Sequence, residues 1–229
     1  MELKKQAIEK VDQANEFISN SPIIKGLFDG GLSLIPIIGQ AISSSLDARS
    51  FKLFEENTKQ FTKELKSLIE NVDERKIDKN FLESPEFTSI LIDTLARNAR
   101  AYENEKVKNY AKIFANYLTL KGSSIAYKEG FIKILDELTV DHIRIMAFIC
   151  NQVDNPTEEN EKIRDRVLAE DASNRLDIPL ERVLAYCQHL LRFGLIRDWG
   201  IGKLGAYKPD KFSITDYGRE LVQLLTSSK

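Results

Sequence analysis

The stretch "PLERVLAYCQHLLRFGLI", residues 179–196, decides the fold of the C-terminal part of the chain. Pro179 suits the start of a helix, because its φ is fixed near the helical value and the first turn needs no N–H from it. Gly194 suits the end of the helix, because glycine readily adopts the left-handed conformation that terminates helices. Apolar residues recur between the two at helical spacing, which predicts one buried face. That face comprises Leu180, Val183, Leu184, Cys187, Leu190 and Leu191.

The segments on either side of this helix complete a known order of elements. Residues 164–178, "RDRVLAEDASNRLDI", predict a second helix that leads into a turn. Residues 195–215 predict two short strands around a glycine-rich turn, and residues 216–225 predict a closing helix. Helix, turn, helix and β-hairpin follow one another as they do in a winged helix. We therefore expect a winged helix at the C-terminus.

The N-terminal half predicts helices only. Its longest periodic pattern alternates spacings of three and four, as in a heptad repeat, and predicts a long helix packed lengthwise on others. This pattern comprises Phe51, Phe54, Thr58, Phe61, Leu65, Leu68 and Val72. A second inward stripe comprises Phe87, Leu91, Leu95, Asn98 and Tyr102, and it follows a helix-start signal at Ser84 and Pro85. The expected protein is mainly α-helical, with a helical bundle at residues 1–125 and a winged-helix-like domain with a small β-hairpin at 126–229.

The uncharged stretch "GGLSLIPIIGQAISSSL", residues 30–46, belongs to an apolar segment that spans residues 22–46. A membrane-spanning helix needs about 20 mostly apolar residues, and this segment includes Lys25 and Asp29, so a single span is not expected. Two interpretations stay open. The segment either fills the centre of the bundle, or forms a hairpin that is released to perturb a membrane. The residues concerned are Leu34, Ile35, Pro36, Ile37, Ile38 and Ile42.

Composition is that of a folded water-soluble chain. Of its 229 residues, 42% are hydrophobic and 30% charged, and the formal net charge of −2 offers no broad positive field for nucleic acid. Two cysteines are too few for a disulfide framework, which indicates a reducing compartment. The N-terminal residues have no apolar signal-peptide core. We expect a cytoplasmic protein, with membrane association on activation left open.

No pattern in the chain indicates catalysis. His142 and His189 are far apart in the sequence, form no metal-ligand spacing, and His189 is expected on the surface. The glycines of "GIGKLG", residues 200–205, lie between two expected strands, whereas a phosphate loop must open a helix. We therefore expect no enzyme activity, no metal, no cofactor and no small-molecule substrate.

Three short motifs carry a resemblance to a known family. They are Leu138-Thr139, Phe193-Gly194-Leu195-Ile196 and Thr215-Asp216-Tyr217-Gly218. In this order, over roughly Lys108 to Leu225, the sequence resembles the bacterial abortive infection alpha (Abi-alpha) family. The resemblance implies a role in phage defence by growth arrest, and it implies no catalytic residue.

Two modes of action are compatible with these patterns. The first is a phage-defence protein that acts by binding, with the apolar segment perturbing a membrane. The alternative is a winged-helix regulator that binds DNA or protein. Its contact residues would be Arg182, Gln188, Arg192 and Lys203, whereas Glu181 and the acidic residues upstream would repel phosphate. A protein partner or self-association is expected, because an aromatic stripe wider than one helix can cover would leave a dimer face.

Overall fold

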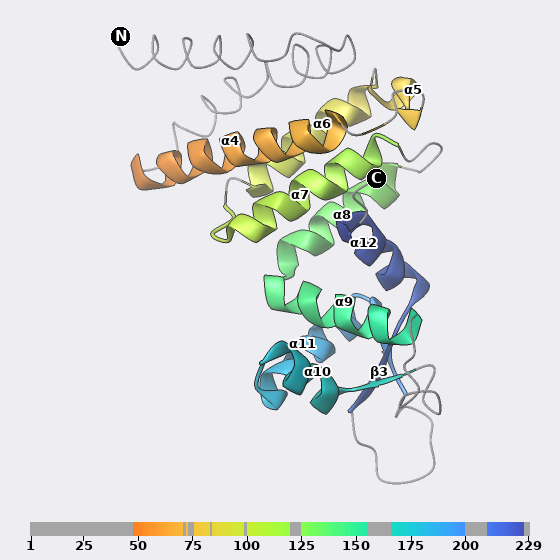
Figure 1. Cartoon of the computed structure of the whole chain (residues 1–229). Helices are drawn as coiled ribbons and strands as arrows, with labels where there is room; N and C mark the ends of the chain where they lie inside the picture. The colour runs from red at the N-terminus through yellow and green to blue at the C-terminus, as the bar shows by residue number, and fades with distance from the viewer. Residues whose placement is uncertain are drawn as a thin grey trace. The chain divides into compact units, whose positions relative to one another are not determined.

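The computed structural model describes residues 48–70, 72, 76–82, 84–98, 100–119, 125–154, 166–199 and 210–226 (Figure 1). The chain divides into two compact units, with the boundary between Ile132 and Lys133. The described part is mainly helical and contains a three-stranded antiparallel sheet, which confirms the predicted mainly helical class. Each unit is described below by itself.

The N-terminal unit contains α4 (Ala48–Glu70), α5 (Lys79–Leu82), α6 (Pro85–Asn98), α7 (Asn104–Tyr117) and the first part of α8 (Ile125–Glu137). The start of α6 follows the serine–proline signal, since the Ser84 hydroxyl accepts a hydrogen bond from the Phe87 amide at 3.2 Å. The long helix α4 packs along α7 and also contacts α6, as Figure 1 shows.

Phenylalanine rings from four helices join in the core of this unit. Phe114 of α7 contacts Phe61 of α4 at 6.2 Å between ring centroids and Phe87 of α6 at 5.5 Å. Phe87 in turn contacts Phe81 of α5 at 5.6 Å. Such pairs contribute about 0.5–1.5 kcal/mol each beyond the burial of their area. Phe114 is therefore the centre of this core.

The periodic pattern of α4 lies partly in this core. Phe54, Thr58, Phe61 and Leu65 are buried, whereas Phe51 and Leu68 are half-buried. Val72 lies beyond the end of the helix at Glu70. The inward stripe of α6 is wrong at its last residue, because the helix ends at Asn98 and the Tyr102 side chain is 90% exposed.

A buried amide pair fixes α4 against the C-terminal end of α6. The Asn57 side chain donates to the carbonyls of Asn98 and Ala101, at 2.9 and 2.7 Å. The Asn98 side chain donates back to the Asn57 carbonyl at 3.1 Å. Carbonyls at the end of a helix have no partner within it. The pair bonds one such carbonyl, that of Asn98, and a second carbonyl at Ala101 just beyond the helix, and so joins α4 to the end of α6.

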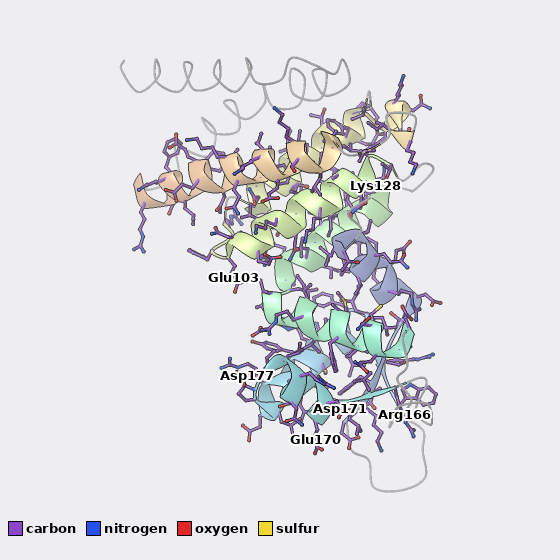
Figure 2. The ribbon with its side chains drawn as sticks, in the orientation of Figure 1. Glu103, Lys128, Arg166, Glu170, Asp171 and Asp177 are labelled. Atoms are coloured by element: carbon purple, nitrogen blue, oxygen red, sulfur yellow. The ribbon has the colours of Figure 1, made fainter. Side chains whose placement is uncertain are left out.

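Lys128 of α8 is buried in the same unit, with only 2% of its surface exposed (Figure 2). Its ammonium nitrogen lies 3.3 Å from the centre of the Phe81 ring. Burial lowers the pKa of this lysine, and the charge of Asp78 opposes that effect. The Lys128 carbonyl accepts a hydrogen bond from the Tyr117 hydroxyl at 2.5 Å, which joins α7 to α8.

The C-terminal unit contains α9 (Val140–Asp154), β1 (Val167–Leu168), α10 (Ala169–Leu176), α11 (Leu180–Arg192), β2 (Ile196–Asp198), β3 (Lys211–Ile214) and α12 (Asp216–Thr226). The strands pair in the order β1-β3-β2, all antiparallel. Val167 pairs with Phe212, and Ile196 pairs with Ile214. Helix α9 packs against β3, α11, α12 and α10, so it is the central helix of the unit.

Strand β1 replaces the first turn of a helix that the sequence predicted for residues 164–178. The strand occupies only Val167 and Leu168, and helix α10 begins at Ala169. Two residues are too few to show the alternation that identifies a strand in a sequence. The Ala169 amide donates to the Asp210 carbonyl at 2.9 Å, which continues the pairing by one bond.

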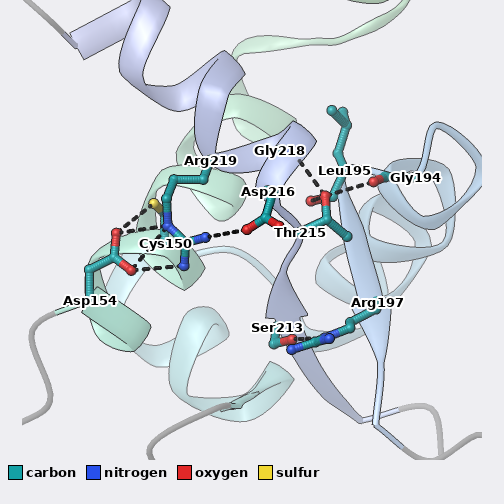
Figure 3. Close-up of polar contacts among 10 residues, drawn as sticks. All are labelled: Cys150, Asp154, Gly194, Leu195, Arg197, Ser213, Thr215, Asp216, Gly218 and Arg219. Atoms are coloured by element: carbon teal, nitrogen blue, oxygen red, sulfur yellow. Dashed lines mark hydrogen bonds and ion pairs between the residues drawn. The ribbon is translucent and has the colours of Figure 1, made fainter.

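Two of the sequence motifs meet at one junction in this unit (Figure 3). The Thr215 hydroxyl lies within hydrogen-bonding distance of the carbonyls of Gly194 and Leu195, at 2.7 and 2.9 Å. The same hydroxyl accepts a bond from the Gly218 amide at 3.0 Å and so caps α12. Gly194 has a φ of +68°, which lets the chain leave α11 in the left-handed conformation.

Arg219 of α12 binds the C-terminal end of α9. Its guanidinium forms an ion pair with Asp154 at 3.0 Å and another with Asp216 at 3.1 Å, as Figure 3 shows. The hydrogen bonds from Arg219 lower the pKa of Asp154. Because these groups are partly exposed, the ion pairs orient α12 more than they stabilise it.

We expect Phe114→Ala to lower the free energy of unfolding by about 3–5 kcal/mol, because it leaves a cavity where three aromatic rings meet. Urea denaturation followed by far-UV circular dichroism measures this change. Ile92→Ala is the control, because this α6 side chain is 38% exposed. Ile92→Ala should lower the free energy of unfolding by about 1 kcal/mol or less. Equal losses for both variants would contradict the central role of Phe114.

We expect Gly218→Ala to destabilise the C-terminal unit by about 3 kcal/mol, because the new methyl group would meet backbone atoms that cannot move aside. A Cβ at this position would lie 2.0 Å from the Leu195 carbonyl oxygen. Trp199, the one tryptophan of the chain, lies in this unit, and its fluorescence during urea denaturation measures the effect.

Gly194→Ala is the matched control for this measurement. A Cβ there meets nothing within 4 Å, so only the left-handed backbone opposes the change, at a cost of about 1–2 kcal/mol. If Gly194→Ala lowered the free energy of unfolding more than Gly218→Ala, the result would contradict the close approach of α12 to Leu195.

Candidate functional site

Helix α11 presents one buried and one exposed face. Val183, Cys187 and Leu190 are buried, with spacings of four and three. Beyond Leu180, the exposed residues of the helix are Glu181, Arg182, Ala185, Gln188 and Arg192, which we call the α11 face. Because 3.6 residues make one turn, these five positions lie along one side of the helix. The α11 face is the candidate interaction surface.

Three of the four residues that the sequence analysis proposed as nucleic-acid contacts lie on the α11 face. They are Arg182, Gln188 and Arg192, and all three are exposed. Lys203 lies outside the described residues. The apolar candidates Leu34, Ile35, Pro36, Ile37, Ile38 and Ile42 also lie outside them.

The charges beside the α11 face are mixed. Helix α10 and the turn after it expose Glu170, Asp171 and Asp177, which Figure 2 labels, together with Arg175. The turn itself is tight, since Asp177 adopts a left-handed φ of 55° and the Ile178 amide donates to the Ser173 carbonyl. The helix pair α10–α11 therefore exposes carboxylates and guanidinium groups together.

A hollow of about 400 Å³ opens at the N-terminal end of α11. Its lining residues are Arg166, Leu168, Ala169, Glu170, Leu180, Leu184, Asp210 and Lys211. Leu180 was predicted to face inward, but it is 36% exposed and lies in the wall of this hollow. The prediction failed because Leu180, in the first turn of α11, borders the hollow, which leaves part of its side chain exposed. Apolar surface therefore adjoins the polar α11 face.

The structure brings together the two histidines that the sequence separates. His142 of α9 is 4% exposed, and its Nε2 lies 3.0 Å from Nδ1 of His189 on α11. Tyr186 contacts the His142 ring at 4.3 Å between centroids, and Phe193 contacts the His189 ring at 5.0 Å. The expectation that His189 is a surface residue is thus corrected, since the ring is half-buried against α9.

His142 also caps its own helix. The Thr139 backbone amide donates to Nδ1 of His142 at 3.1 Å, and the His142 amide lies 3.5 Å from the Thr139 hydroxyl oxygen. This is a capping box in which histidine takes the place of the usual glutamate or glutamine. The sequence signal was present as a threonine three residues before a histidine, but the pairing with His189 depends on tertiary structure.

Neither cysteine has the character of a nucleophile. Burial raises the pKa of Cys150 to about 11, helped by the charge of Asp154, and burial raises the pKa of Cys187 to about 12. Both thiols are free. At neutral pH they are therefore protonated, whereas a reactive cysteine needs its thiolate.

Within the described residues, no group of three or more histidine, cysteine, aspartate and glutamate side chains is placed to hold a metal ion. None of the helices in that part of the chain has the length and apolar character needed to cross a membrane.

The fold and the site define a mainly helical protein whose C-terminal helix-and-sheet unit exposes one polar helix face. A family model described as Abortive infection alpha matches residues 53–224, and the chain belongs to this family. The match confirms the resemblance and extends it to α4 and α6. No curated protein matches the chain, and no solved structure matches it. The family makes this an abortive-infection-type protein.

We expect the native protein at pH 7.5 to react with iodoacetamide at least about 100-fold more slowly than the urea-unfolded chain, because both thiols are buried and protonated. Mass spectrometry of labelled peptides measures each cysteine separately. Rapid modification of either thiol in the native protein would show that the thiol is accessible and ionised, contrary to the structure.

Proposed function

We propose that the protein acts in abortive infection by binding a protein partner through the α11 face. The observation that carries this proposal is the exposure of a complete side of α11, next to a hollow with an apolar wall. Protein interfaces combine an apolar centre with a polar rim and are enriched in arginine. Arg182 and Arg192 lie on either side of the small residue Ala185, which allows another backbone to approach closely.

We further propose that the C-terminal unit is a winged helix. The order of its elements, helix, strand, two helices and two strands, supports this assignment, as does the strand order β1-β3-β2. In such a unit α11 is the second helix of the helix-turn-helix. In DNA-binding proteins of this architecture, the second helix is the recognition helix that contacts the DNA.

Charge favours a protein partner over nucleic acid. The exposed carboxylates of Glu170, Asp171, Asp177 and Glu181 outnumber the guanidinium groups of Arg175, Arg182 and Arg192. Carboxylates beside the contact helix repel phosphate, whereas they can pair with basic residues of a protein. Action without catalysis is part of the same proposal, and the protonated state of both thiols supports it.

Membrane perturbation by residues 22–46 stays a prediction, because those residues lie outside the described part of the chain. Cytoplasmic localisation likewise stays an expectation from the sequence. The test below addresses the α11 face alone.

We expect the double variant Arg182→Glu/Arg192→Glu of the full chain to lose phage protection by at least about tenfold in plaque count, because it reverses two charges of the binding face. The control is Lys63→Glu/Arg100→Glu, which reverses two exposed charges of the N-terminal unit. Circular dichroism and Trp199 fluorescence show that both variants are folded.

Two outcomes would overturn the proposal. Full protection by the α11 variant would show that the face is not used. A tight, salt-sensitive complex between the wild-type protein and DNA fragments at low salt would support the nucleic-acid alternative instead. Sedimentation of the wild-type protein identifies whether a second copy of the chain is the partner.

A further inference from the structure

A backbone amide sets the positions of the protons in the pair His142–His189. The Thr139 amide can only donate, and it points at Nδ1 of His142 at 3.1 Å. That nitrogen must therefore be an acceptor, so a neutral His142 carries its proton on Nε2. Nε2 faces Nδ1 of His189 at 3.0 Å and donates to it. Both rings are neutral in this arrangement, and each carries its proton on Nε2.

One additional proton on the pair removes the acceptor of the Thr139 amide, whichever ring receives it. If His142 is protonated, Nδ1 becomes a donor and can bond to the Thr139 hydroxyl oxygen, which lies 2.7 Å away. If His189 is protonated at Nδ1, it must donate to Nε2 of His142, and the proton of His142 then moves to Nδ1. In both cases Nδ1 of His142 no longer accepts, and the Thr139 amide is left unpaired.

We propose that the pair His142–His189 is a proton-operated switch of the N-terminal cap of α9. The capping box is closed while both rings are neutral, and it opens when the pair binds one proton. Histidine is the side chain suited to this task, because imidazole changes its charge between about pH 5 and 8. The proposal goes beyond the binding function, since it concerns the junction at Leu138 and Thr139 that joins α8 to α9.

Charged and titratable groups on several helices surround the pair. Glu137, the last residue of α8, is exposed two residues before Thr139. On α9, Asp141 forms an ion pair with Arg144 at 2.9 Å, and Arg144 also donates to the Leu176 carbonyl at the end of α10. On α11, Tyr186 touches the His142 ring, while Arg192 is exposed one turn beyond His189.

The remaining groups are further from the pair. Arg175 and Asp177, at the C-terminal end of α10, are exposed. Helix α12 holds α9 at Asp154, twelve residues or about 18 Å along the helix from His142.

The sign of the effect follows from proton linkage. The closed cap requires a neutral pair, whereas the open or unfolded segment binds protons freely. The closed form therefore loses stability as the pH falls through the imidazole range, and gains it as the pH rises. Losing this part-buried capping bond corresponds to about tenfold in the opening equilibrium, within the range for loss of an N-terminal helix cap.

Hydrogen exchange of the Thr139 amide in the full-length protein tests the proposal. We expect its protection factor, corrected for the intrinsic exchange rate, to fall by about tenfold between pH 7.5 and pH 5.5. Nitrogen-15 spectra of the imidazole rings at pH 7.5 should show the proton on Nε2 in both histidines.

His142→Gln is the matched control, because glutamine at this position of a capping box accepts the same bond and does not titrate. We expect its Thr139 protection factor to be the same at both pH values. His189→Asn keeps an uncharged acceptor near Nδ1 and should weaken the pH effect without abolishing it, because His142 can still bind a proton.

Three results would overturn the switch. One is a wild-type protection factor that changes by less than about twofold between the two pH values. Another is an equal fall in His142→Gln. The third is a spectrum that places the proton of His142 on Nδ1 at pH 7.5, and this measurement needs no variant to fold.

Discussion

The C-terminal unit depends on the contact between the end of α11 and the start of α12. One hydroxyl, that of Thr215, bridges the carbonyls of Gly194 and Leu195 and caps α12 through the Gly218 amide. Gly218 lets α12 lie directly on the Leu195 backbone. Strand β2 starts one residue after Leu195, and strand β3 ends one residue before Thr215. The same contact therefore aligns β2 with β3. The family motifs at these positions are thus explained by packing and capping, and they need no catalytic role.

Helix α11 is held at its C-terminal end by that junction and on its inner side by the ring of His142. Its outer side is left to solvent, with charges of both signs. A helix fixed in this way is a rigid support for recognition, since its backbone is set before a partner arrives. Two features adjoin α11: the capping box of α9, which contacts His189, and the hollow beside Leu180. They lie on different sides of α11. The proposed binding surface and the proposed proton-sensitive pair therefore consist of separate residues.

The sequence predicted the helical class, the family and most helices, because helix starts and apolar periodicity are local signals. The start of α6 at Ser84–Pro85 and the turn at Gly194 are examples. Strand β1 was missed because its two residues are too short to alternate. Tyr102 was placed inward because periodicity does not reveal that α6 ends at Asn98, and Leu180 because it does not reveal the hollow beside α11. The histidine pair was missed because its members are 47 residues apart and meet only through the packing of α9 on α11.

Burial of the Lys128 amine in the N-terminal unit disfavours its charged form. While the amine carries its proton, the closed bundle offers it an aromatic ring and the charge of Asp78 in place of water. Any rearrangement that opened the bundle at α8 would return this ammonium to bulk solvent and release the hydration energy that burial withholds. The charged amine therefore lowers the stability of the closed helical unit, and this cost disappears when the amine is deprotonated at alkaline pH.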